Sequence, residues 1–173
     1  ELGEVWYDEA KEYVKILSLR FDTPQLICAG VVSALSPNNR WERNKLDAHT
    51  VLDAVSQSLS SSQVKVCTFN NNKEKAFAIA RGDIKILQQS PKTYAFAKNI
   101  SGEDINKVTI DKWHLRAVQT RSSSPKACKT SVTPLQYKLL EKDCQKVAKK
   151  YNINPSTLQA TVWVTIRNRW ANN

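Results

Sequence analysis

The sequence contains no methionine, only four glycines, and no apolar run near the roughly 20 residues that a membrane-spanning helix needs. The lack of such a run excludes a helical membrane protein. The first residues, ELGEVWYDEAKEYV, are acidic and amphipathic rather than basic and then apolar, so they do not resemble a signal peptide. Because an initiating methionine is missing, we expect the chain to start inside a longer product. We also expect an intracellular protein without membrane contact.

Local metal-binding and nucleotide-binding motifs are missing as well. The four cysteines are 39, 61 and 16 positions apart, and none belongs to a C-x2-C pair. This spacing excludes a zinc site or an iron–sulfur cluster built from local motifs. Neither a P-loop pattern nor a Ser/His/Asp grouping occurs. We therefore expect no metal and no small-molecule cofactor, and free thiols in a reducing compartment, with Cys28 and Cys144 buried.

Positive charge is abundant and lies in one half of the sequence. The formal net charge is +10. Residues 1–86 carry 11 Lys and Arg against 11 Asp and Glu, whereas residues 87–173 carry 15 against 5. A polyanionic partner is indicated, and nucleic acid is the commonest one. The alternative is a basic surface that only aids solubility.

Helical periodicity dominates the chain and predicts an all-α protein of eight or nine helices. Pro24 is expected in the first turn of the second helix, after Asp22 or Thr23 as its N-cap. The stretch VKVCTF, residues 64–69, alternates like a strand, but it is short and isolated and also fits an extended link. Residues 121–133 form the one linker-like segment. The expected helices span 2–19, 24–35, 40–57, 73–82, 83–89, 91–100, 111–120, 135–151 and 157–172.

Two neighbouring stretches carry the candidate chemistry. LQQSPKTYAFA, residues 87–97, predicts a helix, a tight turn and a second helix with a basic first turn, a shape that directs backbone N–H groups and Lys92 at a phosphate. VTID, residues 108–111, predicts an extended entry to a helix that starts at Asp111. As an N-cap, Asp111 would stabilise that helix by roughly 1 kcal/mol, and this structural interpretation is the commoner one for such a residue.

These stretches resemble the helix-hairpin-helix DNA glycosylases, in particular the endonuclease III branch. In that family a hairpin of the form L-P-G-V-G-x-K-T-A is followed about eighteen residues later by V-D-T-H-x-x-R-V. Here LQQSPKTYAFA and VTIDKWHLRAV occur in the same order, with 19 positions from Lys92 to Asp111. Upstream, AGVVSALSPNNRWERNKLDA and FNNNKEKAFAIARG are similar to two further family segments, so the resemblance covers residues 24–118.

The resemblance implies a two-lobed, all-α glycosylase-like domain over residues 1–173. Its central lobe would be residues 24–120, with a degenerate hairpin, and residues 1–23 and 134–173 would form the second lobe. The implied activity is excision of a damaged or modified base flipped out of double-stranded DNA, as in base excision repair. The implied protein is a monomer.

The resemblance also assigns the site residues. Asp111 would stabilise the oxocarbenium-like sugar and help to activate the nucleophile. Lys92 would attack the sugar as in bifunctional members with AP-lyase activity, which requires a partly unprotonated amine; the alternative is a solvated lysine that contacts phosphate. The remaining expected DNA contacts lie in the hairpin and beside Asp111; they are Gln88, Gln89, Ser90, Thr93, Lys112, His114 and Arg116.

The loop SPNNR with the tryptophan after it would enter the DNA beside the extruded nucleotide. Asn38 and Asn39 offer donors and acceptors to unpaired bases, and Arg40 offers a phosphate contact. Ser36 begins this loop. Trp41 would stack on a base, or it packs in the core beside an ordinary turn between helices.

Two departures from the family keep other functions open. The hairpin glycines are replaced by Gln88-Gln89-Ser90-Pro91, and glycine is what permits close approach of backbone to phosphate. No C-terminal four-cysteine cluster occurs, so no iron–sulfur centre is implied. The alternatives are a catalytically inactive DNA-binding protein of this fold, a phage-type enzyme that modifies bases, and an all-α interaction module with an acidic partner.

Overall fold

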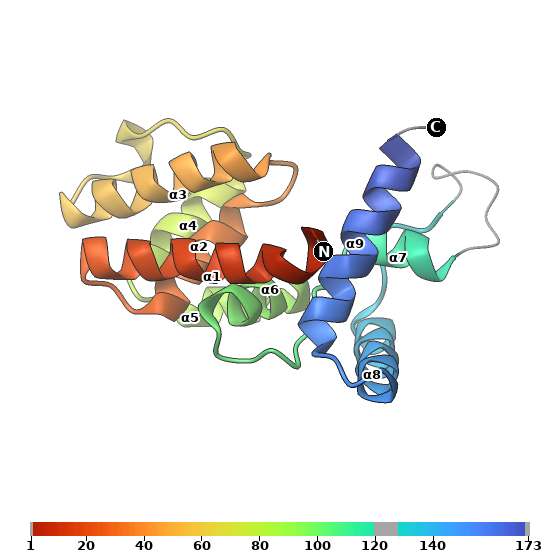
Figure 1. Cartoon of the computed structure of the whole chain (residues 1–173). Coiled ribbons are helices and arrows are strands. Elements are labelled where there is room, and N and C mark those ends of the chain that lie inside the picture. Colours follow the sequence, from red (N-terminus) through yellow and green to blue (C-terminus); the bar gives the residue numbers. More distant parts are fainter. Residues whose placement is uncertain (1, 120–127, 172–173) are drawn as a thin grey trace. The chain divides into compact units, whose positions relative to one another are not determined.

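A computed structural model describes residues 2–119 and 128–171 of the chain (Figure 1). The regular structure within these residues is helical, which confirms the prediction of an all-α protein. No described helix is both long enough and apolar enough to cross a membrane. The helices are α1 (Leu2–Phe21), α2 (Gln25–Leu35), α3 (Trp41–Ser56), α4 (Asn70–Ala80), α5 (Ile84–Gln88), α6 (Pro91–Ser101), α7 (Lys112–Val118), α8 (Pro134–Lys150) and α9 (Pro155–Ala171), with a 3-10 turn at Ser61–Gln63.

Local capping chemistry sets several helix boundaries. Asp83 caps α5 by accepting the N–H of Lys85 at 3.2 Å, and Pro91 occupies the first turn of α6. Gly102 ends α6 with a φ of 78°, in the left-handed region that glycine adopts without strain. One expected start is displaced: α2 begins at Gln25, with Pro24 as the residue before it. Residues 64–69 form an extended link, not a strand, within the described chain.

The chain forms two compact units. Unit 1 comprises Glu1–Ala10 and Asp104–Asn173, and unit 2 comprises Lys11–Glu103. These boundaries differ from the expected 24 and 120, because α1 from Lys11 onward packs within unit 2 and residues 104–119 pack within unit 1. The predicted linker, 121–133, lies outside the described residues as far as position 127. That the units are glycosylase lobes stays a prediction.

Unit 2 is built around α2, whose residues from Cys28 to Leu35 are buried. Helices α3, α4 and α6 pack against it. Gly30 allows this close packing, because a Cβ at that position would lie 2.8 Å from Ile79 Cγ2 and 3.2 Å from Leu87 Cδ2. A hydroxyl adds to the contact with α6, since Ser33 donates to the carbonyl of Thr93 at 2.7 Å.

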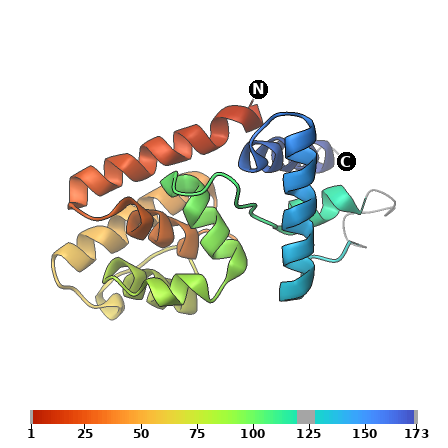
Figure 2. The ribbon, with the colours of Figure 1, turned by 90° about the horizontal axis from the view of Figure 1, so that it is seen from below.

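Unit 1 has a separate apolar core between the extended segment before α7 and helices α7 and α8. Its buried residues are Val108, Ile110, Leu115, Tyr137 and Cys144. Helix α9 packs against both α7 and α8, and it crosses α8 in Figure 2. The first turns of α1 join this unit through Trp6, whose ring centroid lies 5.3 Å from that of Trp163. Cys28 and Cys144 are buried as predicted.

Candidate functional site

Asp111 lies at the start of α7 and holds its carboxylate in a fixed orientation. Its Oδ1 atom accepts the backbone N–H groups of Trp113 and His114, each at 2.9 Å, so the predicted cap is confirmed. The side chain is partly exposed. The other oxygen, Oδ2, has no hydrogen-bond partner within the described residues. One oxygen therefore anchors the group, and the second is available to a ligand.

Two buried tyrosines fix the extended segment that leads into Asp111. The Tyr137 hydroxyl donates to the carbonyl of Val108 at 2.8 Å and accepts the N–H of Ile110 at 3.2 Å. The Tyr7 hydroxyl lies 3.3 Å from Thr109 Oγ1 and 2.9 Å from an oxygen of the Gln159 side chain. These hydrogen bonds hold the backbone before Asp111 in one conformation.

Both phenols stay protonated at neutral pH. Burial raises the pKa of Tyr7 and that of Tyr137 well above the usual value, and the negative charge of Asp111 raises both further. The two hydroxyls are therefore permanent hydrogen-bond donors. Their part is to position the segment, because neither phenol ionises at neutral pH.

A basic aromatic surface follows Asp111 on α7. The guanidinium of Arg116 lies 4.6 Å from the centroid of the Trp113 ring, and Lys112 Nζ lies 5.6 Å from it. Lys112 is exposed, and Trp113 and Arg116 are partly exposed. The predicted DNA contacts Lys112 and Arg116 thus flank an aromatic ring, an arrangement that suits nucleic-acid phosphates and bases.

His114 does not fit its predicted role as a DNA contact. Its side chain is only 6% exposed, on the inward face of α7. Burial lowers the pKa of His114 below the usual value, although the Asp111 charge acts in the opposite direction. The ring is therefore neutral at pH 7. Its Nδ1 atom is buried without a hydrogen-bond partner among the described residues. The residue belongs to the interior of unit 1.

The predicted order of a helix, a short turn and a second helix is present in unit 2 as α5 and α6. Gln88 and Gln89 are exposed at the turn. The hydroxyls of Ser90 and Thr93 lie 3.0 Å apart and bond to each other, which closes the first turn of α6. Lys92 is exposed beside them.

The exposure of Lys92 bears on the two roles expected for it. A nucleophilic lysine depends on burial or on a neighbouring cation to lose its proton. The side chain of Lys92 is open to solvent. Lys92 belongs to unit 2 and Asp111 to unit 1. The position of Lys92 in the first turn of α6 suits a phosphate contact.

The loop between α2 and α3 presents two of its predicted contacts to solvent. Asn38 is exposed with a φ of 59°, in the left-handed region that asparagine tolerates better than most residues. Arg40 is also exposed. Ser36 is less available, because its hydroxyl donates to the carbonyl of Ser33 at 2.9 Å.

Trp41 and Asn39 are engaged inside unit 2. The Trp41 ring packs edge-on against Tyr13 of α1, with 6.2 Å between the centroids, which favours the packing role over base stacking. The Asn39 amide donates to Asp47 Oδ2 at 3.0 Å. Both residues therefore hold the loop against the helices of unit 2.

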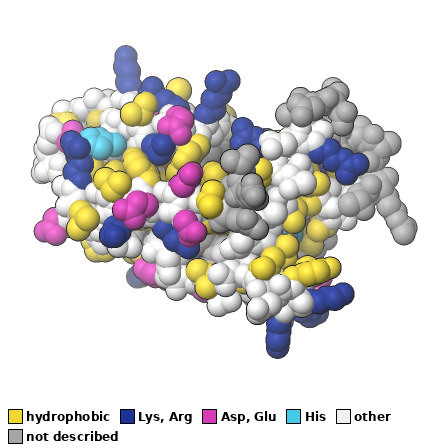
Figure 3. Space-filling model, in the orientation of Figure 1, with side chains coloured by type: hydrophobic (Ala, Val, Ile, Leu, Met, Phe, Trp, Pro, Cys, Tyr) yellow, Lys and Arg dark blue, Asp and Glu magenta, His cyan; other side chains and the backbone are white. Residues whose placement is uncertain are grey.

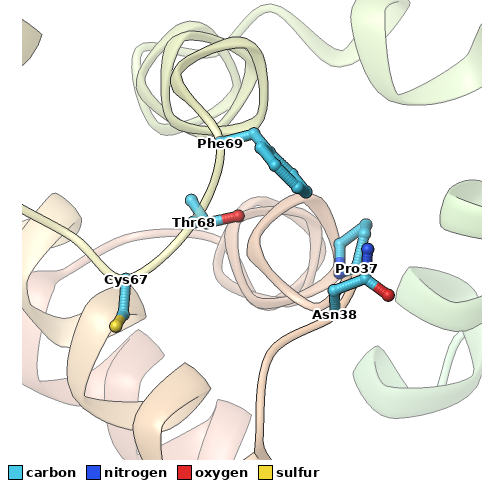
Figure 4. Close-up of a pocket in the computed structure, with 5 residues that line it drawn as sticks. All are labelled: Pro37, Asn38, Cys67, Thr68 and Phe69. Atoms are coloured by element: carbon cyan, nitrogen blue, oxygen red, sulfur yellow. The ribbon is translucent and has the colours of Figure 1, made fainter.

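The same loop forms one wall of an open pocket with a volume of about 290 Å³. Figure 4 shows the rings of Phe69 and Pro37 facing this space, with the Thr68 hydroxyl directed into it and Asn38 at its edge. The Phe69 side chain is 65% exposed. Cys67 completes the lining. An exposed aromatic ring beside an amide fits a planar, hydrogen-bonding ligand such as a nucleobase.

Asp47, a buried residue of α3, connects the two walls of this pocket. Its carboxylate accepts the Asn39 amide from the loop at 3.0 Å and the backbone N–H of Cys67 from the extended link at 3.0 Å. Arg43 Nε donates to the same carboxylate at 3.0 Å. The side chain of Asp47 is 1% exposed. No local sequence pattern indicates the roles of Asp47 and Phe69, because these roles depend on contacts between distant segments.

Within the described residues, no group of three or more His, Cys, Asp or Glu side chains is placed to hold a metal ion. The candidate groups are thus a fixed carboxylate in unit 1, an aromatic pocket in unit 2 and exposed cations in both units.

Comparison with known proteins places the chain in one family. It matches DUF7178, described as a family of unknown function, over residues 1–170, and it belongs to that family. No curated protein matches the chain. No solved structure matches it either.

Proposed function

We propose that this member of DUF7178 binds double-stranded DNA and hydrolyses the N-glycosidic bond of an extruded nucleotide, with Asp111 as the catalytic carboxylate. The observation that carries the proposal is the state of that carboxylate. Oδ1 is fixed by two backbone N–H groups, and Oδ2 is left without a partner in the described part of the chain. The order of hairpin and aspartate, which resembles that of the endonuclease III branch, supports the assignment.

The proposed reaction uses the charge and the basicity of Asp111. As the bond from C1′ to the base nitrogen breaks, the bonding electron pair leaves with the base, and positive charge develops on the sugar. A preoriented carboxylate stabilises that charge without reorganisation. Water then forms the new bond to C1′ and gives up a proton, which Oδ2 is free to accept.

The exposed side chains of the hairpin and of α7 are proposed to hold the DNA. Lys92 and the N–H groups at the start of α6 would contact phosphates, and so would Lys112 and Arg116. In unit 2, the pocket beside Asn38 and Phe69 would contact an unpaired base of the duplex. These residues are proposed to bind the DNA, and Asp111 is proposed to carry out the chemistry.

A second candidate, a DNA-binding protein of the same fold that does not cleave, is favoured by two observations. Lys92 is exposed, and the turn Gln88–Pro91 lacks the glycines that the family uses to approach phosphate. A base-modifying enzyme of this fold remains the related alternative. Both alternatives bind duplex DNA and release no base.

The test uses duplexes that each carry one damaged or modified base opposite its usual partner. We expect at least one of these duplexes to gain an alkali-labile abasic site with release of the free base. We also expect no covalent adduct when borohydride is added, because Lys92 contacts phosphate. If the protein binds every duplex and releases no base, the glycosylase function is rejected in favour of a DNA-binding protein that does not cleave. A borohydride adduct that disappears in Lys92→Ala but persists in Lys75→Ala would restore the lyase role.

A further inference from the structure

The outward face of α8 carries a line of lysines that the candidate site does not use. Lys138, Lys142, Lys146 and Lys149 are all exposed, and Lys150 follows them. Steps of four, four and three residues bring the first four to one side of the helix. Figure 3 shows Lys and Arg side chains that stand out from the region of α8.

The packing of α8 prevents this face from turning inward. The opposite side of the helix buries Tyr137, Cys144 and Ala148. The hydroxyl of Tyr137 is fixed to the backbone of Val108 and Ile110. The rotation of α8 about its own axis is therefore determined by the core of unit 1, and the lysines must point away from that core.

Most of these charges have no acidic partner in the described structure. Lys146 lies 3.3 Å from Asp143, and both of these side chains are largely exposed. Glu141 is engaged elsewhere, since it pairs with Lys107 at 3.5 Å and accepts the N–H of Val108. Lys138, Lys142 and Lys149 have no ion pair among the described residues, so their charge is available to an external anion.

The helix dipole does not account for the whole line. Cations are favoured in the last turn of a helix, which explains Lys149 and Lys150. Lys138 and Lys142 lie in the first half of α8, beyond the reach of that effect. A second reason is needed for charges that repel one another along one face.

We infer that the lysine face of α8 is a contact surface for the phosphate backbone of duplex DNA, additional to the candidate site. At a rise of about 1.5 Å per residue, the four lysines span roughly 17 Å. About five phosphates of one DNA strand lie along that length, at roughly 3.4 Å of axis each. The four cations thus face about five phosphates over the same length, so the charge density of this face is close to that of one strand.

A lipid surface fits this face less well. A helix that lies on a membrane exposes a broad apolar side to the lipid. The broad apolar side of α8 is buried in unit 1, and the exposed leucines on its lysine side are confined to one end, at Leu135 and Leu139. The inference rests on the proposed binding of DNA, and it is independent of any cleavage by Asp111.

The test compares the salt dependence of binding to a duplex of about 20 base pairs with normal bases, between 50 and 200 mM KCl. In the variant Lys138→Gln/Lys142→Gln/Lys149→Gln we expect the slope of log K against log salt to become less steep by about 2–3 units. Wild type should then lose about 40-fold more affinity than the variant over this range. The control Lys15→Gln/Lys75→Gln/Lys129→Gln removes the same charge from scattered exposed positions and should change the slope by less than about one unit.

Further variants make the result decisive. Replacing the same three lysines with arginine keeps the charge and should preserve the wild-type slope. Equal slopes for the α8 variant and the scattered control would overturn the inference, while base release by wild type would still support the proposed function. Binding weakened more by Leu135→Ser/Leu139→Ser than by the three lysine substitutions, with a salt slope like that of wild type in both variants, would also overturn it, in favour of an apolar contact. A flattened slope in the α8 variant, with base release absent from wild type, would support the α8 surface and reject the glycosylase.

Discussion

Replacing Asp47 with alanine should destabilise unit 2 and open the pocket beside Phe69. The carboxylate accepts three hydrogen bonds, each at 3.0 Å, from Asn39, Arg43 and the backbone of Cys67. A hydrogen bond to a charged group contributes about 1.5–3 kcal/mol when it is shielded from water. The Arg43 side chain is 49% exposed, so its contribution is reduced to under about 1 kcal/mol. The expected loss is therefore about 3–7 kcal/mol.

The matched control is Asp53→Ala on the same helix. Asp53 accepts one exposed hydrogen bond, from the Gln57 amide at 2.8 Å, and its loss should cost less than about 1 kcal/mol. Urea unfolding followed by far-ultraviolet circular dichroism measures both variants. Hydrogen exchange over residues 64–69 gives the local effect, since the Cys67 amide loses its acceptor only in Asp47→Ala. If the two variants unfold within about 1 kcal/mol of each other and exchange equally, the assigned role of Asp47 is wrong.

Three further outcomes are expected. Tyr137→Phe leaves the buried N–H of Ile110 without its acceptor and should lower the free energy of unfolding by about 1–3 kcal/mol; an unchanged urea midpoint would contradict the role assigned to the Tyr137 hydroxyl. Gly30→Ala places a Cβ 2.8 Å from Ile79 Cγ2 and should cost about 1–3 kcal/mol by the same measurement, whereas a neutral result would mean that the contact relaxes freely. Cys67 is the one exposed cysteine of the four, so a thiol titration of the folded protein at pH 8 should show a single fast reaction, and a second fast thiol would refute the described burial.

Alkaline pH gives an independent check on the buried acids. Burial raises the pKa of Tyr13 to about 12 and the pKa values of Cys28 and Cys144 to about 11. The folded state therefore keeps protons that the unfolded state releases, and the free energy of unfolding falls as pH rises above about 9. Urea midpoints that stay level from pH 8 to about pH 10.5 would contradict this.

Capping chemistry made several structural features predictable from sequence. The sequence predicts helix starts at Asp83 and Asp111; in the structure Asp83 accepts one backbone N–H group of the first turn and Asp111 accepts two. Pro91 was expected in a first turn and lies there. These signals act over three or four residues, so they are visible without knowledge of the fold.

Features that depend on distant contacts were not predictable. The pocket requires Asn39, Asp47 and Cys67 to meet, and nothing local to any of them indicates this. The burial of His114 depends on which face of the short helix α7 meets the core. The excess of positive charge lies in the second half of the sequence, but it is shared equally by the two units of the structure. Each unit carries 13 Lys and Arg against 8 Asp and Glu, because the acidic first residues belong to unit 1.

The most direct test of the central claim compares two helix caps. Asp111→Asn and Asp83→Asn each replace a capping aspartate with asparagine, which caps a helix about equally well, so both variants should keep the stability of wild type. In single-turnover base release from the duplex that wild type cleaves, Asp83→Asn should match wild type. Asp111→Asn should be slower by at least about 100-fold, the usual effect of removing a group that stabilises developing charge. Equal rates for the two variants would contradict a catalytic role for Asp111.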